Sequence, residues 1–185
     1  MFALGIDPGL SRCGYGAVRV EGGGLREAES GHLATPPDAP LAERLGALLG
    51  AIRGILGRLR PDVMVVERVL FQVNARTAMS VGQASGVALA AAADAGVPVV
   101  QYSPNEVKLA VAGYGSATKD QVQSMVQVLL GLAEVPRPPD RADALALAIC
   151  HLTGARLRAA VHDGEARMDA ALGDRPRVPG GGGAR

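Results

Sequence analysis

The first part of the chain alternates between short apolar runs and turn residues. Residues 2–7 (FALGID) form an uninterrupted apolar run that ends at Asp7-Pro8-Gly9, a pattern typical of a central strand buried on both faces. Residues 14–20 and 25–34 predict two further strands, which three consecutive glycines connect. Strands joined by so short a link pair antiparallel, so this part of the chain predicts a three-stranded meander.

From residue 41 the hydrophobic period changes from that of a strand to that of a helix. Leucine and isoleucine recur every three or four residues from Leu41 to Leu59, which predicts an amphipathic helix that Pro61 ends. Apolar runs predict strands at 62–67 and 97–102. Strand–helix alternation after a meander predicts an α/β domain, with one mixed sheet of about five strands and helices on both faces. Further helices are expected at 75–95, 104–112, 118–132 and 139–158.

Composition narrows the class of protein. With 185 residues, 48% apolar and 20% charged, the chain is long and apolar enough for one folded domain. We expect that domain at 1–160 and a polar, glycine-rich, disordered tail at 161–185. The net charge of +1 excludes a polycation, so any binding to nucleic acid must use a local basic patch.

The cellular setting follows from two weaker signals. The start of the chain lacks the pattern of a signal peptide, and the uncharged stretch at 77–93 contains polar residues, so we expect no membrane span. Cys13 and Cys150 are too few for a disulfide framework and are interpreted as reduced thiols in the cytoplasm.

Carboxylates stand where predicted elements end or begin. Asp7 and Glu67 each end an apolar strand, while Asp140 and Asp143 lie three residues apart at the start of the last helix and share a face. Sites in open α/β sheets form beyond the carboxyl ends of strands. A cluster of acids there would need a counter-charge, and oxygen ligands favour Mg²⁺ or Mn²⁺. Two such ions would serve phosphodiester hydrolysis. Taken singly, an acid at such a position is more often a turn or capping residue than a ligand, and it is the combination of the four that favours a metal site.

Basic and aromatic residues suggest how DNA would be held. Of 19 basic residues only Lys108 and Lys119 are lysines, and Arg68 and Arg76 flank the loop after the strand at 62–67. Arginine pairs bidentately with phosphate. Phe71, in that loop, would wedge between bases or stack on one. The alternatives are a solvated arginine surface and a loop anchor in the core.

The predicted helix at 75–95 is rich in small residues, which allow close backbone approach. It either lies tightly on its own sheet or meets a second copy of itself in a dimer. These residues are Gly82, Ser85, Gly86, Ala90, Ala91 and Ala92.

Four segments, taken in order, resemble the RuvC family of Holliday junction resolvases over residues 2–155. They are GIDPGLSRCGYG, VVERVLFQVNARTAMSVGQASGVAL, EVKLAVAGYGSATKDQVQSMV and PPDRADALALAICH. The resemblance implies a ribonuclease-H-like fold and a homodimer, with the helix at 75–95 as its contact. It also implies metal-dependent, paired, symmetric nicking of four-way DNA junctions in recombination and repair, and a branch-migration helicase as partner.

The resemblance also assigns residues. The metal-binding and catalytic carboxylates would be Asp7, Glu67, Asp140 and Asp143, with two ions per site. Lys108 and Lys119 would bind DNA or stabilise the transition state. In the family, an aromatic residue stands at the third position after the catalytic glutamate. This chain has Leu70 at that position and Phe71 directly after it, so the base-stacking role is assigned to Phe71. Some relatives carry histidine where Asp140 stands, which makes Asp140 a candidate general base as well as a ligand.

Three other classes of protein fit parts of the same pattern. A ribonuclease H or RNA-processing nuclease would use the same acids on another substrate. An actin-like nucleotide-binding domain would use GIDPGLSRCGYG as a phosphate loop, although the chain is short for two lobes. A junction-binding module without activity would need the basic residues alone.

Overall fold

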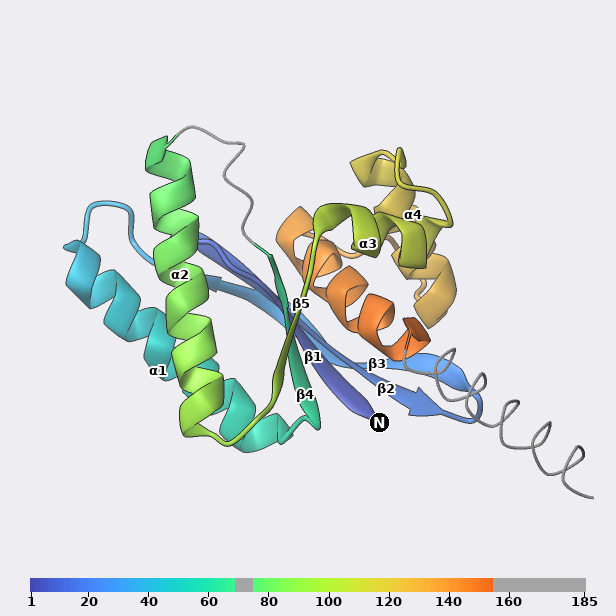
Figure 1. Cartoon of the computed structure of the whole chain (residues 1–185), viewed down its shortest axis with the longest axis horizontal. Helices are drawn as coiled ribbons and strands as arrows, with labels where there is room; N and C mark the ends of the chain where they lie inside the picture. Colours follow the sequence, from blue (N-terminus) through green and yellow to red (C-terminus); the bar gives the residue numbers. More distant parts are fainter. Residues whose placement is uncertain (69–74, 155–185) are drawn as a thin grey trace, which may run out of the picture. The chain divides into compact units, whose positions relative to one another are not determined.

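The computed structural model describes the backbone of residues 1–68 and 75–154, and the side chains of 1–68 and 78–154. Its centre is a five-stranded mixed sheet with the order β3-β2-β1-β4-β5 (Figure 1). β1 is antiparallel to β2 and parallel to β4, while β3 and β5 extend the sheet at its two edges. The predicted α/β class is confirmed, as is the mixed sheet of five strands that begins with an antiparallel meander. The strands are Phe2–Asp7, Arg12–Glu21, Gly24–Ala34, Val63–Glu67 and Val99–Tyr102.

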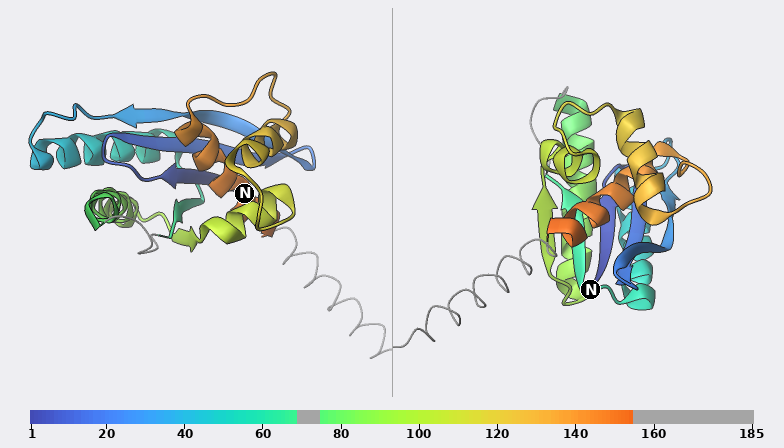
Figure 2. Two further views of the ribbon diagram at one scale, coloured as in Figure 1. Left: turned by 90° about the horizontal axis from the view of Figure 1, so that it is seen from above. Right: turned by 90° about the vertical axis from the view of Figure 1, so that its right-hand side faces the viewer.

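Helices cover both faces of the sheet, and each face has its own core. Because side chains alternate along a strand, Ala3 of β1 contributes to one core and Leu4 to the other. The core containing Leu4 lies under α1 (Leu41–Leu59) and α2 (Ala75–Asp94). The core containing Ala3 lies under α3 (Pro104–Ala112), α4 (Lys119–Leu130) and a last helix at 139–154 (Figure 2).

The start of α4 is held by a capping box. The side chain of Thr118 accepts a hydrogen bond from the backbone N–H of Gln121, and the Gln121 side chain accepts one from the backbone N–H of Thr118 at 2.8 Å. Such a pair satisfies two backbone donors that the helix itself leaves free. The capping box therefore fixes Lys119 as the first residue of α4.

Glycines let the last helix lie directly on the backbone of β1 and β2. A Cβ atom at Gly5 would stand 1.9 Å from the carbonyl oxygen of Ala144, and one at Gly14 would stand 1.9 Å from that of Asp140. On the helix side, buried alanines such as Ala148 present little bulk to the sheet. The helix therefore passes closer to the strands than side chains at Gly5 and Gly14 would permit.

A polar contact with β3 holds the start of the same helix. Arg141 donates from Nη2 to Glu27 Oε1 at 2.9 Å and from Nε to the hydroxyl of Ser30. Both Arg141 and Glu27 are largely shielded from water, which makes such an ion pair stronger than an exposed one. The first turn of the helix is thus attached to the sheet on both sides of Asp140.

The predicted tail and the predicted end of the last helix concern residues that the structure does not describe. Residues Met1–Thr153 form one compact unit, whereas the expected tail at 161–185 and the end of the helix predicted at 139–158 lie outside the described residues. Among the helices that the structure describes, none combines the length and apolar character needed to cross a bilayer.

We predict that Gly14→Ala destabilises the protein strongly, because its methyl group would overlap the Asp140 carbonyl. Overpacking of this kind costs about 1–3 kcal/mol or more. Gly54→Ala is the matched control: Gly54 lies on an exposed part of α1 with open space around its Cα, so alanine there should stabilise by about 0.5–1 kcal/mol. Urea unfolding measures both, and equal midpoints for the two variants would contradict the close contact.

Candidate active site

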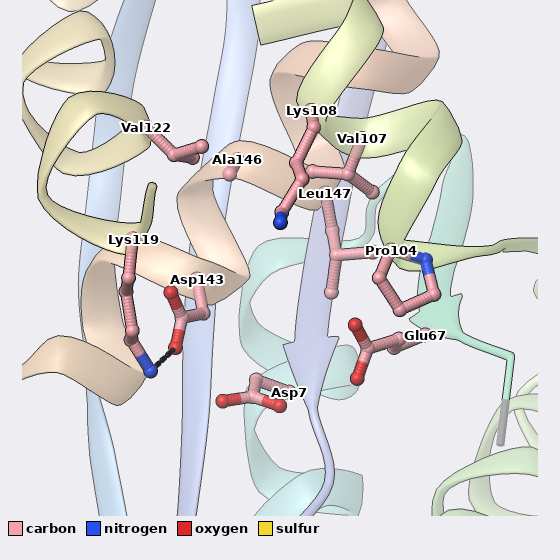
Figure 3. A pocket seen from close by; sticks show the side chains of 10 residues that line it. All are labelled: Asp7, Glu67, Pro104, Val107, Lys108, Lys119, Val122, Asp143, Ala146 and Leu147. Atoms are coloured by element: carbon pink, nitrogen blue, oxygen red, sulfur yellow. Dashed lines mark ion pairs between the residues drawn. The ribbon is translucent and has the colours of Figure 1, made fainter. Parts of the chain in front are cut away.

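A cavity of about 410 Å³ opens where β1 and β4 end. Three carboxylates and two lysines share its lining (Figure 3). The carboxylates of Asp7, Glu67 and Asp143 face a common space, and apolar side chains of α3, α4 and the last helix form the wall behind them. The lining residues are Asp7, Glu67, Pro104, Val107, Lys108, Lys119, Val122, Asp143, Ala146 and Leu147.

The sheet register brings the first two acids together. β1 and β4 are parallel neighbours, with Ile6 opposite Val66, so their next residues, Asp7 and Glu67, leave the same edge of the sheet side by side. Asp143 reaches this edge from the last helix, which crosses β1 and β2. The predicted convergence of Asp7, Glu67 and Asp143 therefore has its geometric basis in two strand ends and one helix start.

Asp140 lies beside this lining rather than in it. Asp7 pairs with Gly14 across β1 and β2, and Gly14 in turn touches the backbone of Asp140. Asp140 Oδ2 is buried and has no hydrogen-bond partner among the described residues, although Arg12 Nε lies 3.6 Å away. The fourth predicted acid is thus adjacent to the other three and directed toward Arg12.

Burial and mutual repulsion make these acids hard to ionise. Burial, followed by the negative charges of Asp143, Glu67 and Asp140, raises the pKa of Asp7 to about 7, against a smaller lowering by Lys119. Burial and Asp143 likewise raise the pKa of Glu67, and burial is the main cause that raises the pKa of Asp143. The pocket therefore carries unfavourable negative charge that a bound cation would relieve.

Lys119 supplies part of that counter-charge. Its ammonium group lies 2.6 Å from Asp143 Oδ2, as the dashed line in Figure 3 marks. Burial alone would lower the pKa of Lys119, but its hydrogen bond to Asp143 and the charges of Asp143, Asp7 and Asp140 outweigh burial and raise it. Lys108 enters the same pocket from α3. Both predicted lysines therefore line the same pocket as the three carboxylates.

The donor set fits a hard divalent cation. It consists of carboxylate oxygens, including the buried Asp140 Oδ2 that no described donor satisfies. In the positions that the side chains adopt here, no three ligating groups of residues 1–68 and 78–154 stand close enough to share one ion. Lys119 engages one of these acids, and a cation of higher charge would allow the acids to approach one another more closely.

The other residues predicted to contact DNA either stand outside the pocket lining or lie outside the described residues. Arg68 follows β4 directly, is exposed, and donates from Nη2 to the carbonyl of Gln101 at 3.3 Å. It is not among the residues that line the pocket. Leu70 and Phe71 lie outside the described residues, and so does the side chain of Arg76.

Two features of the site were missed by sequence reasoning. Arg12 faces Asp140, and Arg141 holds the helix start through Ser30 and Glu27. An arginine within the glycine-rich turn after Asp7 was the available signal for Arg12. Nothing in the sequence pattern connects Arg141 with residues more than a hundred positions earlier.

Comparison with known proteins gives a consistent result. Residues 3–151 match the family "Crossover junction endodeoxyribonuclease RuvC". A relative of that name from Chloroflexus aggregans is 56% identical over 151 residues, which cover 82% of this chain and 92% of the relative. The Thermus thermophilus RuvC in complex with Holliday junction substrate is 42% identical, with a TM-score of 0.81, over 85% of this chain and 96% of its own. A yeast mitochondrial Holliday junction resolvase shares the fold, at 12% identity and a TM-score of 0.59 over 82% and 78% of the two chains.

We predict that Asp7→Asn stabilises the protein at pH 8 in the presence of a chelator. The native state keeps a proton on Asp7 up to about pH 7, whereas the unfolded chain releases it near the ordinary value of 3.8. The contribution of protonated Asp7 to stability is therefore present below about pH 4 and lost as the pH rises through about 7.

The shift from 3.8 to about 7 corresponds to a change in the free energy of unfolding of about 4 kcal/mol. Urea unfolding at pH 4 and pH 8 measures it, and Asp38→Asn, at an exposed loop position, is the control. We expect the two variants to differ at pH 8 and to agree at pH 4. An Asp7→Asn protein that is less stable than the native sequence at pH 8 would refute the repulsive cluster.

Proposed function

The chain belongs to the RuvC family of crossover junction endodeoxyribonucleases, and from this premise we propose that it resolves four-way DNA junctions by paired, symmetric nicks made at the acidic pocket. The observation that carries the proposal is the meeting of Asp7, Glu67 and Asp143 in one cavity with two lysines. A relative that shares 42% of the sequence has been solved with a Holliday junction substrate. Such an activity serves DNA recombination and repair.

The carboxylates hold the metal. RuvC nucleases depend on divalent metal, and we propose Mg²⁺ or Mn²⁺, two ions per site, with Asp7, Glu67, Asp140 and Asp143 as the residues that hold them. Two such ions supply Lewis acidity to the attacking water and to the departing 3′ oxygen. Within the chain, the strand ends fix Asp7 and Glu67, and the last helix fixes the two aspartates. The expected products are a 5′-phosphate and a 3′-hydroxyl, which a ligase can seal.

The lysines act on the phosphate. Lys119 is paired with Asp143 and also exposed to solvent, so it can contact a phosphate that enters the pocket without leaving the carboxylates. Lys108 reaches the same space from α3. We assign to both the binding of the scissile phosphate and the stabilisation of the charge that develops on it. Arg68, Arg76 and Phe71 remain predicted contacts to the flanking DNA.

A homodimer through α2 matches the two-fold symmetry of a junction. The small residues of α2 divide between two faces. Ala91 and Ala92 are buried against the protein's own core, whereas Gly82, Gly86 and Ala90 are exposed. The exposed face also carries Met79, which is 67% accessible. This unpartnered surface of small residues supports the predicted helix–helix contact between two copies.

Two further parts of the proposal have narrower support. The branch-migration helicase is proposed as a partner on the family resemblance alone. The cytoplasmic setting is proposed from the sequence, because two cysteines, Cys13 and Cys150, are too few for a disulfide framework.

We predict that Asp7→Asn and Glu67→Gln bind a synthetic four-way junction but cut it at least about 100-fold more slowly, because each removes a charge needed for the reaction rather than for affinity. Single-turnover cleavage in Mg²⁺ or Mn²⁺ and gel-shift binding measure the two effects. Glu134→Gln, at an exposed loop position, is the control. Cutting by either active-site variant at the native rate would remove that residue from the site. Faster cutting of an RNA–DNA hybrid than of the junction would favour the ribonuclease alternative.

Lys119→Ala should lower both cleavage and the salt dependence of junction binding. Loss of one phosphate contact reduces the slope of log K against log salt by about 0.9. Lys119→Arg, which retains the charge, should restore the slope. An unchanged slope together with full activity in Lys119→Ala would exclude the lysine from phosphate binding.

A further inference from the structure

Arg12 stands at the edge of the site with its binding capacity mostly unused. It is the first residue of β2, and its side chain is 63% exposed. Its Nε lies 3.6 Å from Asp140 Oδ2, which is an ion-pair distance but too long for a hydrogen bond. A guanidinium has five N–H donors, and Asp140 Oδ2 is buried without a hydrogen-bond partner among the described residues. The ion pair between Arg12 and Asp140 is therefore not held by a hydrogen bond.

Other arginines of the described part of the chain are held more firmly. Arg58 donates to Glu29 with two nitrogens, and Arg141 donates to both Glu27 and Ser30. Arg44 donates to Thr35 and to Ser11, the residue next to Arg12. These arginines serve the fold, because each one connects separate elements by hydrogen bonds. Arg12 makes no such side-chain hydrogen bond among the described residues, and its ion pair is with Asp140, a carboxylate of the candidate metal site.

The two aspartates of the last helix thus each face a basic residue from a different element. Lys119 of α4 is hydrogen-bonded to Asp143, whereas Arg12 of β2 is only near Asp140. A divalent ion on Asp140 would repel the guanidinium and take its partner away. A guanidinium released at an exposed position beside the pocket is suited to a phosphate, which it binds bidentately.

We propose that Arg12 binds a backbone phosphate of the DNA, and that Asp140 holds it back until a divalent ion occupies the carboxylate. This inference rests on the proposed function. Because the ion and Arg12 compete for Asp140, each weakens the hold of the other. Reciprocity then requires that metal strengthens the contact between Arg12 and DNA, and that removal of Arg12 strengthens metal binding. A residue that merely balanced the charge of Asp140 would leave DNA binding unchanged.

The test compares Arg12→Gln with Arg19→Gln. Arg19 is exposed, lies on the same strand, and stacks over the Phe2 ring at 4.9 Å. Calorimetry without DNA measures Mn²⁺ affinity. Junction binding is measured across a salt series, in Ca²⁺ and in chelator. Arg12→Gln should bind Mn²⁺ about fivefold more tightly or better. In Ca²⁺ its salt slope should be smaller by about 0.9, and in chelator it should equal that of the native sequence. Arg19→Gln should match the native sequence throughout.

A second pair of variants covers the case in which Arg12→Gln folds poorly. Asp140→Asn should free Arg12 without metal and so strengthen junction binding in chelator. Part of that gain should vanish when Arg12→Gln is added, because the gain depends on the guanidinium. An Arg12→Gln protein with native Mn²⁺ affinity, or with the native salt slope in Ca²⁺, overturns the inference, as does a double variant that keeps the whole gain. Failure of the native protein to bind Mn²⁺ or to cut a junction would instead overturn the proposed function.

Discussion

Four carboxylates are held near one another at one edge of the sheet, where burial and the charges of Asp143, Glu67 and Asp140 disfavour the ionised form of Asp7. Burial is the larger cause and the three charges add to it, and together they raise the pKa of Asp7 to about 7. Mutual repulsion would separate the side chains if they stood on loops. Here three rigid attachments oppose it: the parallel pairing of β1 and β4, the contact of the last helix with Gly5 and Gly14, and the bonds of Arg141 to β3. The scaffold therefore sustains a negative site that only positive charge can stabilise.

Positive charge reaches the site in two ways, which explains how one pocket can serve both metal and DNA. Lys119 and Arg12 stand at the two aspartates of the last helix and relieve part of the repulsion. Divalent ions would relieve far more and draw the acids closer than they lie here. If ions carried that charge, basic side chains beside the pocket would become available to the phosphates of a junction. The same electrostatic need would thus connect metal loading with DNA binding.

Much of this could be predicted from the sequence, because the decisive signals are local. Apolar runs and turn residues located the five strands, helical periodicity located α1 and α4, and the acids were found because they end strands or begin a helix. Contacts between residues far apart in the sequence could not be predicted, because they depend on how the strands and the last helix lie against one another. Arg12 meets Asp140, and Arg141 meets Glu27, only because β2 and β3 pass beside a helix more than a hundred residues later. The position of Asp140 outside the cavity lining depends on the same packing.

The central claim is that these acids form one site for divalent ions, and anomalous diffraction tests it most directly. Crystals of the protein soaked in Mn²⁺ would be measured at the manganese absorption edge. The account predicts anomalous peaks between Asp7, Glu67 and Asp143, with Asp140 turned toward them. Peaks confined to other parts of the surface, with the pocket acids unchanged and Lys119 still on Asp143, would contradict it.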